Sequence, residues 1–256
     1  MRDTIRQIVV LTSIGITLLV NGLANALPLN GLTTGEISDR FQVYFVPAGY
    51  VFSIWGIIYL GLIAFAVYQA LPAQKENPRL RAAGGWIILG GIANSAWIFF
   101  WHYEQFPLTL LAMLVLLLSL IQTYLRLGIG KEKVTREESI FVQLPFRVYL
   151  GWITVATVAN VTTLLDYLRW DNFGIPAEVW MSIVLGAVLV IVWLVNFTRY
   201  DIAFTFVILW ALAGIAVKHA PHSAVVIPTW LTIALVSLSL LLPQMSKISP
   251  LFGRKA

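Results

Sequence analysis

The feature that most restricts the fold of this chain is the length of its uncharged segments. Between Arg40 and Lys75 lie 34 consecutive residues without an Asp, Glu, Lys or Arg. A helix of about 20 apolar residues crosses the ~30 Å hydrocarbon core of a bilayer. The whole chain agrees, with 59% apolar residues, only 11% charged residues and a mean hydropathy of +0.83. We therefore expect an all-α fold, a polytopic helical bundle in a membrane.

Charged residues divide the chain into eight apolar segments, and each is close to the length that spans a membrane. We predict transmembrane helices over 7–28, 48–71, 83–102, 106–126, 145–166, 178–197, 200–217 and 224–243. Arg2 and Arg6 precede the first segment, as in a signal peptide. This segment is longer than a usual signal sequence, so we expect it to be retained as the first helix.

The distribution of Lys and Arg predicts the orientation. With the N-terminus inside, thirteen of the seventeen basic residues fall on the inner side of the predicted helices. Arg40, Arg169 and Lys218 fall outside, and Arg147 lies just within the fifth helix. Loops on the cytoplasmic side carry an excess of Lys and Arg, so both termini are expected on the inner side. The net charge of +5 is explained by this topology, and no aromatic-interleaved basic patch suggests nucleic acid.

Reactive side chains are scarce. The chain has no cysteine, which excludes disulfides, thiolate metal sites and cysteine nucleophiles. No Asp or Glu lies deep within a predicted helix, so a proton relay has no obvious residues. His219 and His222 have a spacing that could present two nitrogens to a metal, but no carboxylate accompanies them. With His102 they are better interpreted as interfacial histidines in contact with water, and we expect neither a metal site nor catalytic residues.

Amides and tryptophans recur at helical spacing in the third and fifth predicted helices. Residues three or four apart share one face of a helix. Such stripes consist of Asn94, Trp97 and Trp101, and of Tyr149, Trp152, Ala156 and Asn160, with Trp55 at similar depth. One hypothesis is that the amides join helices and the tryptophans fill the core. The other is an aromatic-walled pocket for a large flat apolar ligand, which the amides would orient.

Three stretches resemble a known family. PAGYVFSIWGIIYLG, ANSAWIFF and YLGWITVATVAN are similar, in this order, to the second, third and fifth helices of the tryptophan-rich sensory proteins, also called the translocator protein or peripheral-type benzodiazepine receptor family. The third stretch is the most specific, because Tyr149, Leu150, Trp152, Ala156, Thr157 and Asn160 keep the family's spacing. Only Pro47 of the family's double proline is present, and Tyr50 stands where a Trp would follow it.

The resemblance implies a five-helix core whose pocket, capped by the loop between the first two helices, binds porphyrins and other flat apolar compounds. By position, it implies a ligand site formed by Pro47, Trp55, Asn94, Trp97, Trp152 and Asn160. It covers roughly residues 1–172, and the last three predicted helices have no counterpart in the five-helix family members. We therefore predict a core domain over 1–173 and a three-helix membrane extension over 174–256, with the site confined to the core.

The expected function is that of a membrane receptor, sensor or translocator for a porphyrin, another tetrapyrrole or a sterol-like compound. No cofactor is obligatory on this interpretation, although a porphyrin or haem-like ligand is implied. Light-dependent porphyrin degradation is the one enzymatic activity that the resemblance suggests. The leading alternative is a secondary transporter of a small solute, which would favour charged residues or broken helices within the membrane. The lipid bilayer and the small apolar ligand are the expected partners. Small residues at packing spacings, such as Gly91 and Ser95, fit either contacts within the bundle or a homodimer interface.

Overall fold

The computed structural model describes residues 2–27 and 29–241, and the regular elements among these residues are all helices. The chain divides into two compact units. Unit 1 contains Met1–Val43 and Phe52–Trp170, and unit 2 contains Tyr44–Val51 and Asp171–Ala256. The division differs from the predicted domains in two respects. The boundary follows Trp170 instead of residue 173, and the short segment 44–51 groups with the C-terminal helices.

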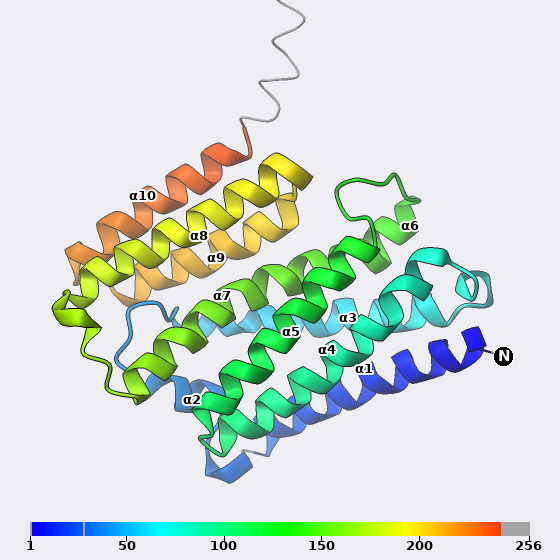
Figure 1. Ribbon diagram of the computed structural model, residues 1–256, viewed down its shortest axis with the longest axis horizontal. Helices are drawn as coiled ribbons and strands as arrows, with labels where there is room; N and C mark the ends of the chain where they lie inside the picture. Colours follow the sequence, from blue (N-terminus) through cyan, green and yellow to red (C-terminus); the bar gives the residue numbers. More distant parts are fainter. Residues whose placement is uncertain (1, 28, 242–256) are drawn as a thin grey trace, which may run out of the picture. The chain divides into compact units, whose positions relative to one another are not determined.

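Unit 1 is a bundle of five long helices, which Figure 1 shows side by side. They are α1 (Arg2–Ala26), α3 (Ile54–Ala70), α4 (Pro78–His102), α5 (Phe106–Arg126) and α7 (Leu144–Tyr167). Helix α4 packs against α1 and α5, while α7 packs against α3 and α5. Two short helices, α2 (Thr34–Asp39) and α6 (Arg136–Glu138), lie in the connections.

Proline marks the start of α4 and shapes the start of α7. Pro78 occupies the first turn of α4, where its missing N–H would have no partner in any case, and the Asn77 side chain accepts from the next two free N–H groups. Pro145 is the second residue of α7, which follows a single turn of π-helix at Ser139–Gln143. The wider π turn is a way to accommodate a proline, whose ring would otherwise clash with the carbonyl four residues earlier.

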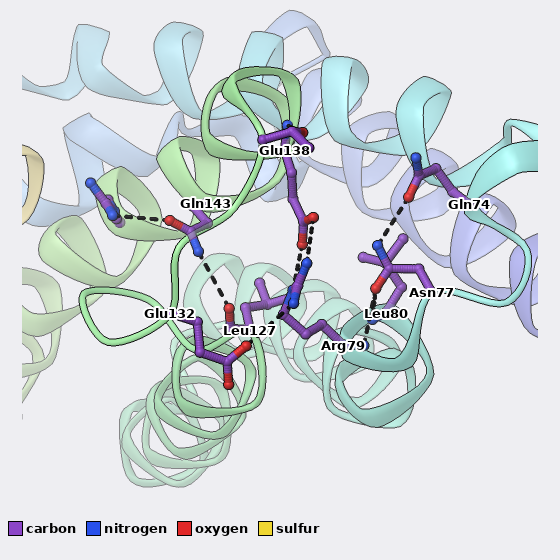
Figure 2. A network of polar contacts seen from close by, with 10 residues as sticks. Gln74, Asn77, Arg79, Leu80, Leu127, Glu132, Glu138 and Gln143 are labelled. Carbon is purple, nitrogen blue, oxygen red and sulfur yellow. Dashed lines mark hydrogen bonds and ion pairs between the residues drawn. The ribbon is translucent and has the colours of Figure 1, made fainter.

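A cluster of charged and amide side chains connects the loops at the N-terminal end of α4 (Figure 2). The Arg79 guanidinium donates to both carboxylate oxygens of Glu138 at 2.6 Å and to Glu132 at 3.3 Å. Glu138 is buried, and the paired geometry is the strongest form of ion pair for arginine. In the same cluster the Gln143 amide donates to the Leu127 carbonyl. These contacts join the start of α4 to the connection between α5 and α7.

Unit 2 contains three helices, α8 (Ala177–Arg199), α9 (Ile202–Lys218) and α10 (Ser223–Ser239). Helix α10 packs against both α8 and α9. A buried amide joins all three, because Asn196 donates to the Ser239 hydroxyl at 2.7 Å and accepts from the Thr205 hydroxyl at 2.9 Å. Interhelical hydrogen bonds of this kind replace the hydrophobic driving force that lipid does not supply.

The helices agree with the predicted class, but the count of eight crossings is not confirmed. Within the described residues, six helices are long and apolar enough to cross a membrane. Helices α9 and α10 are apolar but have 17 residues each. At ~1.5 Å per residue they extend about 26 Å, a few ångströms less than a typical hydrocarbon core. Residue 28, the end of the eighth predicted helix and the basic tail lie outside the described residues.

Candidate functional site

Five of the six predicted site residues belong to unit 1, and Trp55 lies at the centre of an aromatic cluster there. Its ring stacks on Tyr59, with centroids 5.5 Å apart, and lies edge-on to Tyr149 at 6.0 Å and Trp152 at 6.2 Å. Phe52 contacts Trp152 from the other direction at 5.6 Å. Spacings of three and four residues bring these rings to the facing sides of α3 and α7.

Both polar atoms of the Asn94 amide have partners within the protein. It donates to the Tyr149 hydroxyl at 2.9 Å and accepts from the Asn21 amide at 2.6 Å. Asn21 in turn accepts from the Tyr59 hydroxyl at 3.1 Å and donates to the Thr17 carbonyl. This chain of bonds joins α1, α3, α4 and α7 in the interior of the bundle. Asn94 therefore orders the aromatic cluster through Tyr149 and Asn21.

Three other predicted residues have buried polar atoms with no hydrogen-bond partner among the residues that the structure describes. These atoms are the indole nitrogens of Trp97 and Trp152 and the side-chain oxygen of Asn160. The residues are 8%, 2% and 3% exposed. The Asn160 nitrogen, by contrast, donates to the Thr109 hydroxyl at 3.1 Å. Leaving a buried polar group unpaired costs about 1–3 kcal/mol, so each of these groups requires an explanation, such as a bound water or a ligand.

A second aromatic group surrounds Trp97 at the C-terminal end of α4. Trp97 stacks on Trp101, with centroids 5.3 Å apart and planes 18° from parallel. Trp101 contacts Phe41 and Phe106, and its indole nitrogen donates to the Thr34 carbonyl at 3.1 Å. The connection between α1 and α3 is thereby attached to the end of α4.

His102 strengthens the same attachment, and its environment corrects the sequence interpretation. Its ring nitrogens lie 3.1 Å from the Thr34 hydroxyl and 3.2 Å from the Leu29 carbonyl, and Asn30 donates to its backbone carbonyl. The side chain is 1% exposed. It is a buried structural group and does not simply meet water.

Pro47 is the predicted site residue that belongs to unit 2. It is buried in the segment 44–51, next to Gly214 of α9. The six predicted residues are thus divided between the units, and the structure describes five of them in one bundle. Their role in binding a ligand stays a prediction.

One cavity inside unit 1 adjoins Tyr149. It is enclosed by residues of all five long helices, namely Ile14, Thr17, Leu62, Trp86, Ile87, Gly90, Gly91, Leu120, Phe146 and Tyr149. Its volume of about 20 Å³ accommodates a single water molecule and not a ring system. Thr17 and Tyr149 supply polar atoms for such a water.

A comparison of the sequence with known protein families shows which family the chain belongs to. A family described as TSPO-like protein matches residues 7–242. The chain belongs to this family. The matched range includes α8, α9 and α10. The likeness to the family therefore extends beyond residue 172, where the sequence analysis placed its end. No curated protein and no solved structure matches the chain.

Membership in the TSPO-like family and the apolar helices together establish an integral, multi-pass membrane protein. Sequence reasoning missed one residue of the interior, Asn21. A signal for it was present, because Thr17, Asn21 and Asn25 lie four residues apart on one side of α1. Their polar groups cannot face lipid without a penalty, which points them toward other helices.

Proposed function

We propose that this TSPO-like protein is a membrane sensor or translocator that binds a flat ring compound with polar edge groups among the aromatic residues of unit 1. The single observation that carries the proposal is the set of unpaired buried atoms on Trp97, Trp152 and Asn160. The described residues contain four other buried atoms of this kind, but three of the seven belong to the predicted site residues. A ligand that bonds to them would recover the cost of their burial.

The unpaired atoms also restrict the chemistry of the ligand. The two indole N–H groups only donate, so the ligand must offer acceptors such as carboxylate or carbonyl oxygens. The Asn160 oxygen only accepts, so the ligand must offer a donor such as a pyrrole N–H or a hydroxyl. A porphyrin carries both kinds of group on a flat apolar ring, whereas a sterol with one hydroxyl satisfies fewer of them. Porphyrins and related tetrapyrroles are therefore the preferred class.

The proposed arrangement in the membrane has eight crossings, with both termini on the inner side. The excess of basic residues on that side motivates it. Helices α9 and α10 would cross with a slight local thinning of the bilayer or with flanking residues such as Lys218 extended to the interface. Trp97 and Asn160 then lie in the outer half of the bilayer, toward the outer ends of α4 and α7.

The test replaces single N–H groups without removing aromatic rings. Trp152→Phe and Trp97→Phe should each weaken binding of protoporphyrin IX by roughly tenfold, since each removes one hydrogen bond of about 1.4 kcal/mol. The melting temperature should hold or rise, because an unpaired buried group is lost. Binding is followed by the porphyrin absorbance band in detergent, which does not depend on the number of tryptophans.

Trp193→Phe is the matched control. Its indole nitrogen already donates to the Leu235 carbonyl at 3.1 Å, within unit 2. This variant should lose stability and keep porphyrin affinity. If the Trp152 and Trp97 variants bind porphyrin as tightly as the original protein does, the ligand site is not there.

A further inference from the structure

The segment 44–51 packs on α9 of unit 2. The Ala48 N–H donates to the Gly214 carbonyl at 3.2 Å. The Trp210 indole nitrogen donates to the Val51 carbonyl at 3.1 Å, and the Trp210 ring lies edge-on to Tyr50 at 5.4 Å. Helix α9 therefore supplies partners for one backbone N–H group and one backbone carbonyl of this segment. An unpaired backbone group inside a membrane costs several kcal/mol.

Gly214 permits this close approach because it has no side chain. A Cβ atom placed on Gly214 would overlap the Cγ2 methyl of Val51 and would lie 3.2 Å from the Cβ of Pro47. Val51 is fully buried, and Pro47 is buried beside it. Neither can move aside without opening the contact. The absence of a side chain at Gly214 is thus a steric requirement of the docked segment.

The other end of the segment is also anchored within unit 2. The Tyr44 hydroxyl bonds to the Glu178 carboxylate of α8 at 3.0 Å. Its ring lies edge-on to His219, at the end of α9, with centroids 5.4 Å apart. The segment is held at Tyr44, at Ala48 and at Val51, so it has little freedom between its two ends.

The docked segment leads directly into the first turn of α3. Val51 lies in a turn of 3₁₀ helix, η2 (Gly49–Ser53), and α3 begins at Ile54. Trp55, the centre of the aromatic cluster, follows one residue later. Val51 and Trp55 are thus four residues apart on a continuous stretch of helical backbone.

We propose that Trp210 and Gly214 of α9 are positioning residues, which hold the segment 44–51 and so fix the start of α3 and the affinity of the proposed site. The three C-terminal helices then control the ligand site through this strip of α9, contrary to the expectation that the site is confined to the first five helices. Only the statement about affinity rests on the proposed function. The docking itself does not depend on any ligand.

Disulfide crosslinking tests the docking. The Val51 Cβ lies 3.4 Å from a Cβ placed on Gly214, at the short end of the Cβ separations of disulfides, and the chain has no native cysteine. A protease site placed in the exposed connection 173–176 separates residue 51 from residue 214 after cleavage. With Val51→Cys and Gly214→Cys the two fragments should stay joined until a reductant is added.

Val51→Cys with Gly186→Cys is the crosslinking control. A Cβ on Gly186, in α8, has no neighbouring atom within 4 Å. This pair should not join the fragments. Equal crosslinking of both pairs, or none at Gly214, would overturn the docking.

Substitution at Gly214 tests the positioning role. Gly214→Ala should speed hydrogen exchange of the amides of Phe52–Tyr59 without ligand and weaken protoporphyrin IX binding by roughly tenfold or more. Ala has the higher helix propensity, so α9 itself gains stability. Adding Val51→Ala removes the overlapping methyl and should restore both quantities, as expected for a direct contact. Gly186→Ala, made as a control, should change neither.

Trp210→Phe provides a milder variant that keeps the ring against Tyr50 and loses only the bond to Val51. It should produce the same two changes, each smaller than in Gly214→Ala. Unchanged exchange in both variants would overturn the proposal. Faster exchange with unchanged porphyrin affinity would overturn the claim that α9 fixes the affinity of the ligand site. If the original protein binds no porphyrin, the proposed function fails, while exchange and crosslinking still decide the docking.

Discussion

Asn21 and Asn94 form a direct amide-to-amide hydrogen bond across α1 and α4, with 2.6 Å between the nitrogen and the oxygen. Both side chains are 1% exposed. The pair lies between Tyr59 and Tyr149, each of which bonds to one of the two amides. Four helices of unit 1 thus share one polar chain, and the aromatic cluster around Trp55 depends on it for its orientation.

Replacing either amide should loosen the bundle. Asn94→Leu and Asn21→Leu each leave the partner amide without one bond, at a cost of about 0.6–2 kcal/mol within a membrane. The double variant should be less destabilised than the sum of the two single variants, because neither amide is then left buried without the other. Melting temperatures in detergent measure this. Additive losses would mean that the two amides act independently.

The proposed topology predicts which introduced cysteines are accessible from outside. Single cysteines at Gln105 and Ala220 should react with an impermeant thiol reagent in intact cells, and cysteines at Ala73 and Glu137 should react only after permeabilisation. All four residues are exposed in the structure. The inner excess of basic residues is the physical reason. Labelling of Ala220 from the same side as Ala73 would exclude eight crossings with the N-terminus inside.

Unit 2 should lose stability at mildly acidic pH. Burial, and then the charge of Lys218, lowers the pKa of His219, although the nearby backbone of Tyr44 and Val46 opposes the shift. In the unfolded chain this pKa returns to about 6.5. The unfolded state therefore binds more protons just below that value, so the stability contributed by neutral His219 is complete above it and is lost as the pH falls.

The measurement is hydrogen exchange of residues 44–51 between pH 7.5 and pH 5.5, corrected for the intrinsic dependence of exchange on pH. The other titratable groups near the ring are Glu178, His222 and Tyr44. In His219→Gln most of this loss of protection at low pH should disappear. In His222→Gln the loss should be about as large as in the original protein. A loss that persists in His219→Gln would assign it to another group.

The cluster around Arg79 should contribute to the stability of unit 1. Glu138→Gln keeps the shape of the side chain but removes the charge that pairs with the guanidinium. We expect a loss of about 1–3 kcal/mol, because Glu138 is buried. Glu132→Gln is the matched control, since its side chain is more than half exposed and its pair with Arg79 is longer. That change should cost less than about 1 kcal/mol.

Much of the architecture of unit 1 follows from the sequence alone. Uncharged segments between basic loops define α4, α5 and α7 to within a few residues, because lipid accepts only helices whose backbone groups are paired internally. The stripe from Tyr149 to Asn160 also shows which face of α7 turns inward. These are local properties, determined by the helical period and by the cost of placing polar groups in hydrocarbon.

Tertiary structure alone decided which polar atoms have partners. Asn94 and Asn160 are similar in sequence context, yet Asn94 bonds to Asn21 and Tyr149 while the oxygen of Asn160 has no partner among the described residues. Only the packing of α9 assigns residues 44–51 to unit 2, since the contact of Gly214 with Val51 joins positions far apart in the chain. Helical periodicity relates residues within one helix, whereas the bonds that define this site connect different helices, and their geometry is set only when the helices pack.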